Sequence, residues 1–117
     1  MNKLLLVDDE AHVRKLYEEI LSRDGHKVTA VATALEAMNI LRREKYDLII
    51  LDIELEESSG LDILKELKRM YPDIPVILNS AYTVYKSDFH TWVADAYVIK
   101  SSDMEPLKEK IRELAHV

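Results

Sequence analysis

The chain has 117 residues, no cysteine and a formal net charge of -6, and 48% of its residues are hydrophobic. This length allows one domain with a sizeable core. The acidic balance argues against direct nucleic-acid binding, which needs a basic face, and the absence of cysteine excludes disulfides and thiolate zinc sites. No apolar run is long enough for a membrane span or a signal peptide, so we expect a cytoplasmic protein without membrane contact.

The first half of the chain alternates short apolar runs with amphipathic segments. Leu4–Val7 is continuously apolar, which is typical of a strand buried on both faces. A helix closed by Gly25 is predicted next, and then a strand at the sheet edge over Val28–Ala32. Thr33–Glu36 fits a capping box that opens a second helix. The apolar faces of these helices are Val13, Leu16, Tyr17, Ile20 and Leu21 in the first, and Ala34, Ala37, Met38 and Leu41 in the second.

The middle of the chain repeats this alternation. Leu48–Asp52 predicts a central strand whose last residue is a carboxylate. Ser59 can cap a third helix, after which two prolines lead into a strand over Val76–Leu78. We expect Asn79–Ala81 to end that strand because these residues are polar or small. The apolar face of the third helix is Leu61, Leu64, Leu67 and Tyr71.

The last part of the chain predicts two more helices and a strand. Aromatic and apolar residues at helical spacing indicate a short helix, and Tyr97–Ile99 follows as a strand. Ser102–Glu105 fits a second capping box, which would open the final helix. The residues concerned are Tyr85, Phe89, Trp92 and Val93 in the short helix, and Leu107, Ile111 and Leu114 in the last. About five helices alternating with five strands predict a doubly wound α/β fold around a parallel sheet.

Polar side chains follow four of the predicted strands. Asp8 and Asp9 follow the first strand, Asp52 ends the third, Ser80 follows the fourth and Lys100 follows the fifth. Because the carboxyl ends of parallel strands meet at one sheet edge, we expect these groups to converge. Clustered carboxylates suit Mg²⁺, a hard cation that accepts phosphate oxygens. An ammonium and a hydroxyl beside them would complete a receptor for a phosphoryl group carried on Asp52.

The chain resembles the receiver domain of two-component response regulators (CheY-like) over essentially its whole length, residues 1–117. The resemblance implies a flavodoxin-like fold with strand order 2-1-3-4-5. The motifs that carry it stand in order and at compatible spacing. They are Leu5-Leu6-Val7-Asp8-Asp9-Glu10, Asp52, Gly60-Leu61, Pro75-Val76-Ile77, Ser80-Ala81, Tyr97 and Lys100.

The resemblance implies roles at the acidic edge. Asp52 would be the phosphorylation site and would accept a phosphoryl group from a sensor histidine kinase or a phosphotransfer protein. Asp8, Asp9 and Asp52 would hold the Mg²⁺ cofactor, with the backbone carbonyl of Glu54 as a further ligand. Lys100 would contact the phosphoryl group and act in catalysis with Asp52.

The resemblance also implies a conformational switch. Ser80 would act as catalytic and switch hydroxyl, and Tyr97 would change rotamer with it. A downstream protein partner or an effector domain would bind the switched surface. The chain would not be an enzyme in the ordinary sense, because it would catalyse only its own phosphorylation and dephosphorylation. A strand tyrosine that is simply half-buried is an equal reading of Tyr97.

Two of the chain's departures from the family pattern lie next to the predicted site. Ser101 follows Lys100, where a proline that is frequently cis is common, so the intervening peptide bond is either trans or strained. Glu56 and Glu57 stand where a proline is common in the loop after the phosphoacceptor.

Two other functions stay open on the sequence. A Mg²⁺-dependent phosphatase would use Asp52 as a transient nucleophile, but such sites typically place a second aspartate two positions on, where this chain has Glu54. A receiver-like binding module that is never phosphorylated would not need the full set of groups. Each group alone also has a structural reading, since Asp8 and Asp9 could cap a helix and Lys100 could be a surface lysine.

Overall fold

The computed structural model describes residues 2–53, 60–81 and 94–115, and five strands alternate there with four helices. The elements in chain order are β1 (Lys3–Val7), α1 (Ala11–Arg23), β2 (Lys27–Val31), α2 (Ala34–Arg43), β3 (Leu48–Asp52), α3 (Gly60–Met70), β4 (Val76–Ser80), β5 (Ala96–Ile99) and α4 (Glu105–Leu114). The short helix expected around Tyr85–Val93 and the Ser59 cap lie outside the described residues, as does the side chain of Leu61. No helix in the described ranges is long and apolar enough to cross a bilayer.

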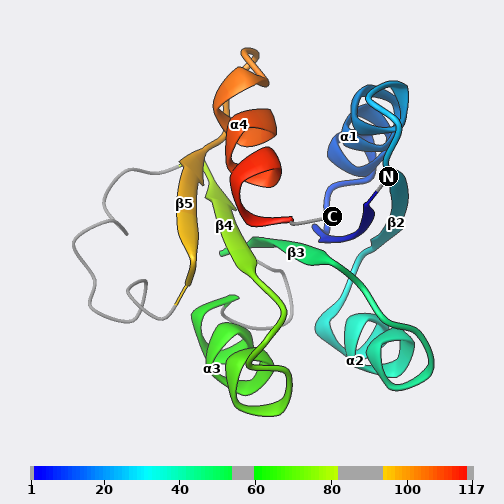
Figure 1. Ribbon diagram of the computed structural model, residues 1–117, viewed down its shortest axis with the longest axis vertical. Coiled ribbons are helices and arrows are strands. Elements are labelled where there is room, and N and C mark those ends of the chain that lie inside the picture. The colour runs from blue at the N-terminus through cyan, green and yellow to red at the C-terminus, as the bar shows by residue number, and fades with distance from the viewer. Residues whose placement is uncertain (1, 54–59, 82–93, 116–117) are drawn as a thin grey trace.

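The sheet has the predicted topology. Its strands are all parallel and follow the order β2-β1-β3-β4-β5. β2 is added on one side of β1, and β3, β4 and β5 are added in turn on the other side. Figure 1 shows α1 and α4 on one face of the sheet and α2 and α3 on the other. This is the doubly wound arrangement, in which ligands bind outside the carboxyl ends of the central strands.

Successive residues of the central strands point to opposite faces, which produces two hydrophobic cores. Leu5 and Ile49 belong to the core beneath α2 and α3, whereas Leu6 and Ile50 belong to the core beneath α1 and α4. Both cores need apolar residues at every strand position, so β1 and β3 are continuous apolar runs. Burying these side chains is the main term that stabilises the fold.

Two helix boundaries depend on local backbone chemistry. The hydroxyl of Thr33 accepts a hydrogen bond from the backbone N–H of Glu36 at 3.2 Å, so the predicted cap of α2 is confirmed. The Glu36 carboxylate accepts from the Thr33 hydroxyl rather than from its backbone N–H, so the box is half formed. Gly25 ends the turn after α1 with φ of 90°, a conformation that a side chain would strain.

The second predicted capping box is wrong. α4 begins at Glu105 after Met104, with no side-chain cap hydrogen bond, and a proline lies in its first turn. Local turns replace the cap, because the Asp103 carboxylate accepts from the Glu105 N–H at 3.0 Å and the Ser101 hydroxyl oxygen accepts from the Asp103 N–H at 3.1 Å. Ser102 is exposed and takes no part in them.

Two further predictions are corrected. β4 continues through Ser80 instead of ending at Leu78, since Asn79 and Ser80 pair in register with Val98 and Ile99. Leu16 was expected on the buried face of α1 but is 49% exposed, because the face that meets the sheet is narrower and centres on its neighbour Tyr17. The edge strand β2 is shifted by one residue from the expected range.

Candidate functional site

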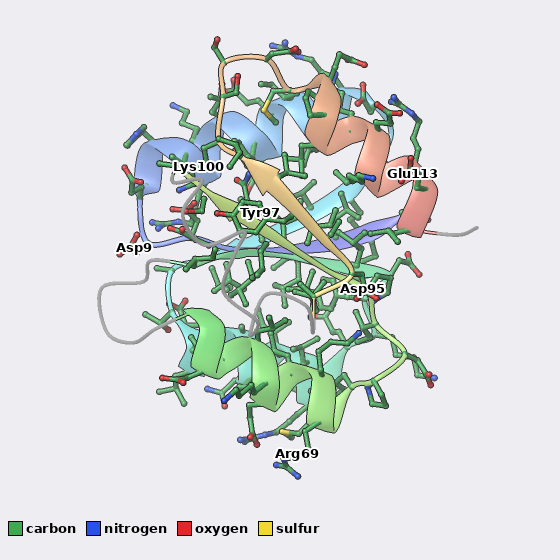
Figure 2. All side chains as sticks on the ribbon, turned by 90° about the vertical axis from the view of Figure 1, so that its left-hand side faces the viewer. Asp9, Arg69, Asp95, Tyr97, Lys100 and Glu113 are labelled. Atoms are coloured by element: carbon green, nitrogen blue, oxygen red, sulfur yellow. The ribbon has the colours of Figure 1, made fainter. Side chains whose placement is uncertain are left out.

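The polar groups predicted at the strand ends do converge on one sheet edge. Figure 2 shows Asp9 and Lys100 at the same end of the sheet, whereas Asp95 lies at the other end of β5. Asp8 and Asp52 are 1% and 4% exposed, so their carboxylates are almost fully removed from water. Two buried acids at one edge require a counter-charge, because an uncompensated buried charge costs several kcal/mol.

Lys100 supplies that counter-charge. Its Nζ lies 2.9 Å from Asp8 Oδ2, 3.3 Å from Asp52 Oδ2 and 3.6 Å from Glu10 Oε1. Burial alone would lower the pKa of Lys100, but the hydrogen bond and the charge of Asp8, with the charge of Asp52, outweigh it and raise the pKa well above its usual value. The ammonium therefore stays protonated at any physiological pH.

A group of four carboxylates surrounds this edge. Oxygens of Asp8, Asp9, Glu10 and Asp52 all lie within 4.8 Å of one another. Opposite ligands of a Mg²⁺ ion are about 4 Å apart, because each lies at about 2.1 Å from the metal. The spacing and the all-oxygen donor set therefore fit Mg²⁺. Glu10 was not among the predicted metal ligands, and its place in the group is a finding of the structure.

The position of Asp8 is fixed from three elements. Its backbone N–H donates to Val31 O of β2 at 3.0 Å, and its carbonyl accepts from Arg14 Nη1 of α1 at 2.8 Å. Its carboxylate Oδ1 accepts from the Glu10 N–H at 2.9 Å, which leaves Oδ2 for Lys100. α1 has no side-chain cap hydrogen bond, so Asp8 does not cap the helix as the sequence allowed; its carboxylate instead closes a turn with Glu10 and takes part in the site.

The remaining predicted residues have different surroundings. Ser80 is fully buried at the end of β4, and its carbonyl accepts from the Lys100 N–H at 2.6 Å, which joins the last two strands at the site. Tyr97 is half-buried and packs against the core beneath α2 and α3. The peptide bond between Lys100 and Ser101 is trans, like every other described bond. Glu54 lies outside the described residues.

Two buried polar residues beside the site were not predicted. Tyr17 was assigned to an apolar helix face and Asn79 to the end of a strand, yet the Tyr17 hydroxyl donates to Asn79 Oδ1 at 2.7 Å. A signal did exist in the sequence. Asn79 lies two residues after Ile77, so strand alternation places it on the face of the sheet that α1 covers.

Solved structures of other proteins share this fold closely. The response regulator TrrA of Thermotoga maritima, in complex with Mg²⁺-BeF, has a TM-score of 0.93 and 39% sequence identity, and the match covers 97% of this chain and 99% of that one. TrrA in complex with the histidine kinase ThkA matches with the same TM-score and identity, over 99% of this chain and 100% of that one.

Sequence relatives agree with the structural ones. Sporulation initiation phosphotransferase F of Bacillus subtilis is 35% identical over 80 residues, which are 68% of this chain and 64% of that protein. The response regulator SaeR of Staphylococcus aureus is 35% identical over 116 residues, which are 97% of this chain and 50% of that protein. The chain thus spans less than two thirds of the length of these relatives. The family model of the response regulator receiver domain matches residues 4–112, and the chain therefore belongs to the response regulator receiver domain family.

Proposed function

We propose that this domain is a phosphorylation-controlled switch in which Asp52 accepts a phosphoryl group from a phosphohistidine of a sensor histidine kinase or phosphotransfer protein. The observation that carries the proposal is the contact of one ammonium, that of Lys100, with two buried carboxylates, those of Asp8 and Asp52, at one sheet edge. The complex of TrrA with a histidine kinase supports the choice of donor.

The transfer itself needs a nucleophile and charge neutralisation. An oxygen of the Asp52 carboxylate attacks the phosphorus as the phosphorus–nitrogen bond of the phosphohistidine breaks, and the imidazole leaves with the electron pair and takes up a proton. Asp8, Asp9 and Asp52 would hold Mg²⁺ with the backbone carbonyl of Glu54. When bound, the ion offsets the negative charge of the phosphoryl oxygens. TrrA in complex with Mg²⁺-BeF supports this assignment.

Lys100 would change partners during the reaction. Before transfer its Nζ contacts Asp8 and Asp52. After transfer an Asp52 oxygen is bonded to phosphorus in an acyl phosphate, and the phosphoryl oxygens add negative charge beside the Asp8 carboxylate, which the ammonium can reach as a mobile point charge. The Ser80 hydroxyl would donate to another of these oxygens. Movement of Ser80, with Tyr97, would then alter the surface of β5 and α4 that a downstream protein partner or an effector domain reads.

The domain would turn over no separate substrate. Its chemistry would be confined to its own phosphorylation and dephosphorylation, since the four carboxylates and Lys100 that meet at this edge fit a phosphoryl group held on Asp52 itself. A covalent aspartyl phosphate would therefore be the signal and not an intermediate on the way to a released product.

Intact-mass measurement after incubation with a small phosphodonor, such as phosphoramidate, and Mg²⁺ tests the proposal. The wild type should gain the mass of one phosphoryl group, and Asp52→Asn should gain none. Asp73→Asn is the matched control, because Asp73 is an exposed aspartate in the turn between α3 and β4, and it should gain one. Equal modification of the wild type and Asp52→Asn, or modification of neither, would refute the assignment of Asp52.

A further inference from the structure

A chain of buried hydrogen bonds runs through the protein just beneath the acidic edge. The hydroxyl of Tyr17 in α1 donates to Asn79 Oδ1 in β4 at 2.7 Å, and Asn79 Nδ2 donates to Val98 O in β5 at 2.9 Å. Tyr17 and Asn79 are 5% and 2% exposed. The Asn79 amide thus uses its acceptor toward the helix and a donor toward the neighbouring strand, so one side chain connects three elements.

The position of this chain in the sheet relates it to the site. Asn79 pairs in register with Asp52 on one side and with Val98 on the other. It also directly precedes Ser80, and Val98 lies two residues before Lys100. Because a strand residue and its second neighbour are rigidly related, fixing Asn79 and Val98 limits where Ser80 and Lys100 can lie.

α1 contacts the site edge at a second point on the same helical face. Arg14 lies one turn before Tyr17, and its Nη1 donates to the carbonyl of Asp8 at 2.8 Å. One face of α1 is therefore bonded to the end of β1 through Arg14 and to the ends of β4 and β5 through Tyr17. The helix spans the distance between the strand that carries Asp8 and the strand that leads to Lys100.

Stability alone does not call for a polar pair at this place. The rest of this core is apolar, and a pair of apolar side chains of similar shape would be about as stable as a buried hydrogen-bonded pair. Burial raises the pKa of the Tyr17 hydroxyl, so it stays a neutral donor at physiological pH. What hydrogen bonds add over apolar packing is direction, because a satisfied buried network fixes one arrangement.

We propose that Tyr17 and Asn79 are positioning residues, through which α1 holds the ends of β4 and β5, and with them Ser80 and Lys100, in place for the chemistry at Asp52. This inference rests on the proposed function for the meaning of the site. The network acts through the ends of β4 and β5, because Asn79 directly precedes Ser80 and bonds Val98 O two residues before Lys100. Removing it should therefore affect the placement of Lys100 even where the protein remains fully folded.

Three variants separate positioning from simple packing. Tyr17→Phe removes the hydroxyl and leaves Asn79 Oδ1 without its hydrogen-bond donor. The double variant Tyr17→Phe/Asn79→Leu replaces both side chains by apolar groups and should recover part of the stability, since Val98 O still loses its Asn79 donor. Tyr46→Phe is the control, because Tyr46 is also 5% exposed and its buried hydroxyl has no hydrogen-bond partner among the residues that the structure describes.

Two measurements are made on each variant. The first is the hydrogen-exchange rate of the Lys100 amide, which donates to Ser80 O at 2.6 Å, relative to that of the Leu5 amide in the same molecule. The second is the rate at which saturating phosphoramidate and Mg²⁺ modify Asp52. In Tyr17→Phe and in the double variant, we expect relative exchange about fivefold faster and modification about fivefold slower, as loss of one hydrogen bond implies. Tyr46→Phe should match the wild type in both.

The outcomes distinguish the two proposals. If the double variant recovers stability and also recovers wild-type exchange and modification, the pair is only packing and the inference is wrong. If Tyr17→Phe exchanges and reacts like Tyr46→Phe, the inference is equally wrong. If the wild type is not modified at all, the proposed function fails, while the exchange of the Lys100 amide still decides whether the network positions that strand end.

Discussion

The single residue Lys100 shows why a lysine suits this edge better than an arginine. Its Nζ lies within 3.6 Å of carboxylate oxygens of Asp8, Asp52 and Glu10. A lysine ammonium is a compact charge with rotatable donors, whereas an arginine guanidinium presents a planar fork that favours one carboxylate. A lysine therefore suits an edge at which one ammonium contacts more than one carboxylate.

His26 is a residue whose protonation should affect folding. It lies between α1 and β2, and within the described part of the chain its buried Nδ1 has no hydrogen-bond partner. Burial lowers the pKa of His26 from its ordinary value near 6.5, and the charge of Asp24 only partly opposes this. The folded state thus takes up a proton less readily than the unfolded state.

The stability of the fold should therefore fall as the pH is lowered. The free energy of unfolding should keep the His26 contribution above pH 6.5 and lose it as the pH falls through the lowered folded-state pKa. Denaturant titrations between neutral and mildly acidic pH measure this decline. It should be smaller in His26→Gln, and it should persist in His12→Gln, since the side chain of His12 is 79% exposed. An equal decline in His26→Gln and the wild type would refute the role of His26.

Helix caps show at the scale of an element how similar sequences give different structures. Thr33 and Ser102 both begin a segment that fits a capping box, but only Thr33 accepts a hydrogen bond from the helix that follows. Asp103 already binds the first N–H of α4, and a proline in the first turn of that helix lacks an N–H of its own. The cap of α4 therefore has no need of Ser102.

Alanine substitution at the two positions should separate them. Thr33→Ala should lower the free energy of unfolding by about 1 kcal/mol, because it removes the cap of α2. Ser102→Ala should change it by less than about 0.5 kcal/mol, as an exposed side chain without such a role does. Urea denaturation with a common slope measures both. Equal losses in the two variants would contradict the assigned caps.

The whole molecule shows which parts of a fold a sequence reveals. The apolar runs of β1 and β3 predicted a two-sided parallel sheet because every position faces a core. The polar groups at strand ends, Asp8, Asp52 and Lys100, converged as the topology requires. β4 was predicted two residues short, because Asn79 and Ser80 are polar yet buried. Their burial depends on partners in other elements, which a local pattern does not contain.

The same reason explains the other missed residues. The spacing of α1 predicted an amphipathic helix, but it could not tell which of two adjacent side chains, Leu16 or Tyr17, meets the sheet. Glu10 follows Asp8 and Asp9 in the sequence, and only the turn made by the Glu10 N–H with Asp8 brings its carboxylate into the group. Contacts between distant elements therefore decide which side chains enter the site, whereas the periodicity of the sequence predicts the sheet edge at which the site lies.

Mg²⁺ should couple this site to the stability of the whole domain. A ligand that binds only the folded state stabilises it by RT ln(1 + [L]/Kd), which is about 1.4 kcal/mol when the concentration is ten times Kd. For a domain of this size that corresponds to a rise in Tm of about 5 °C. Thermal unfolding followed by circular dichroism, with and without MgCl₂ at constant ionic strength, measures the shift.

Two variants show whether Mg²⁺ raises the Tm by binding to the acidic group. Asp9→Asn should lose most of the shift in Tm, because it removes one of the four carboxylates that lie within 4.8 Å of one another. Asp73→Asn should keep the whole shift, since Asp73 is exposed in the turn after α3 and far along the chain from that group. A shift of the same size in Asp9→Asn and Asp73→Asn would mean that Mg²⁺ acts by general charge screening, and the acidic edge would then not be its site.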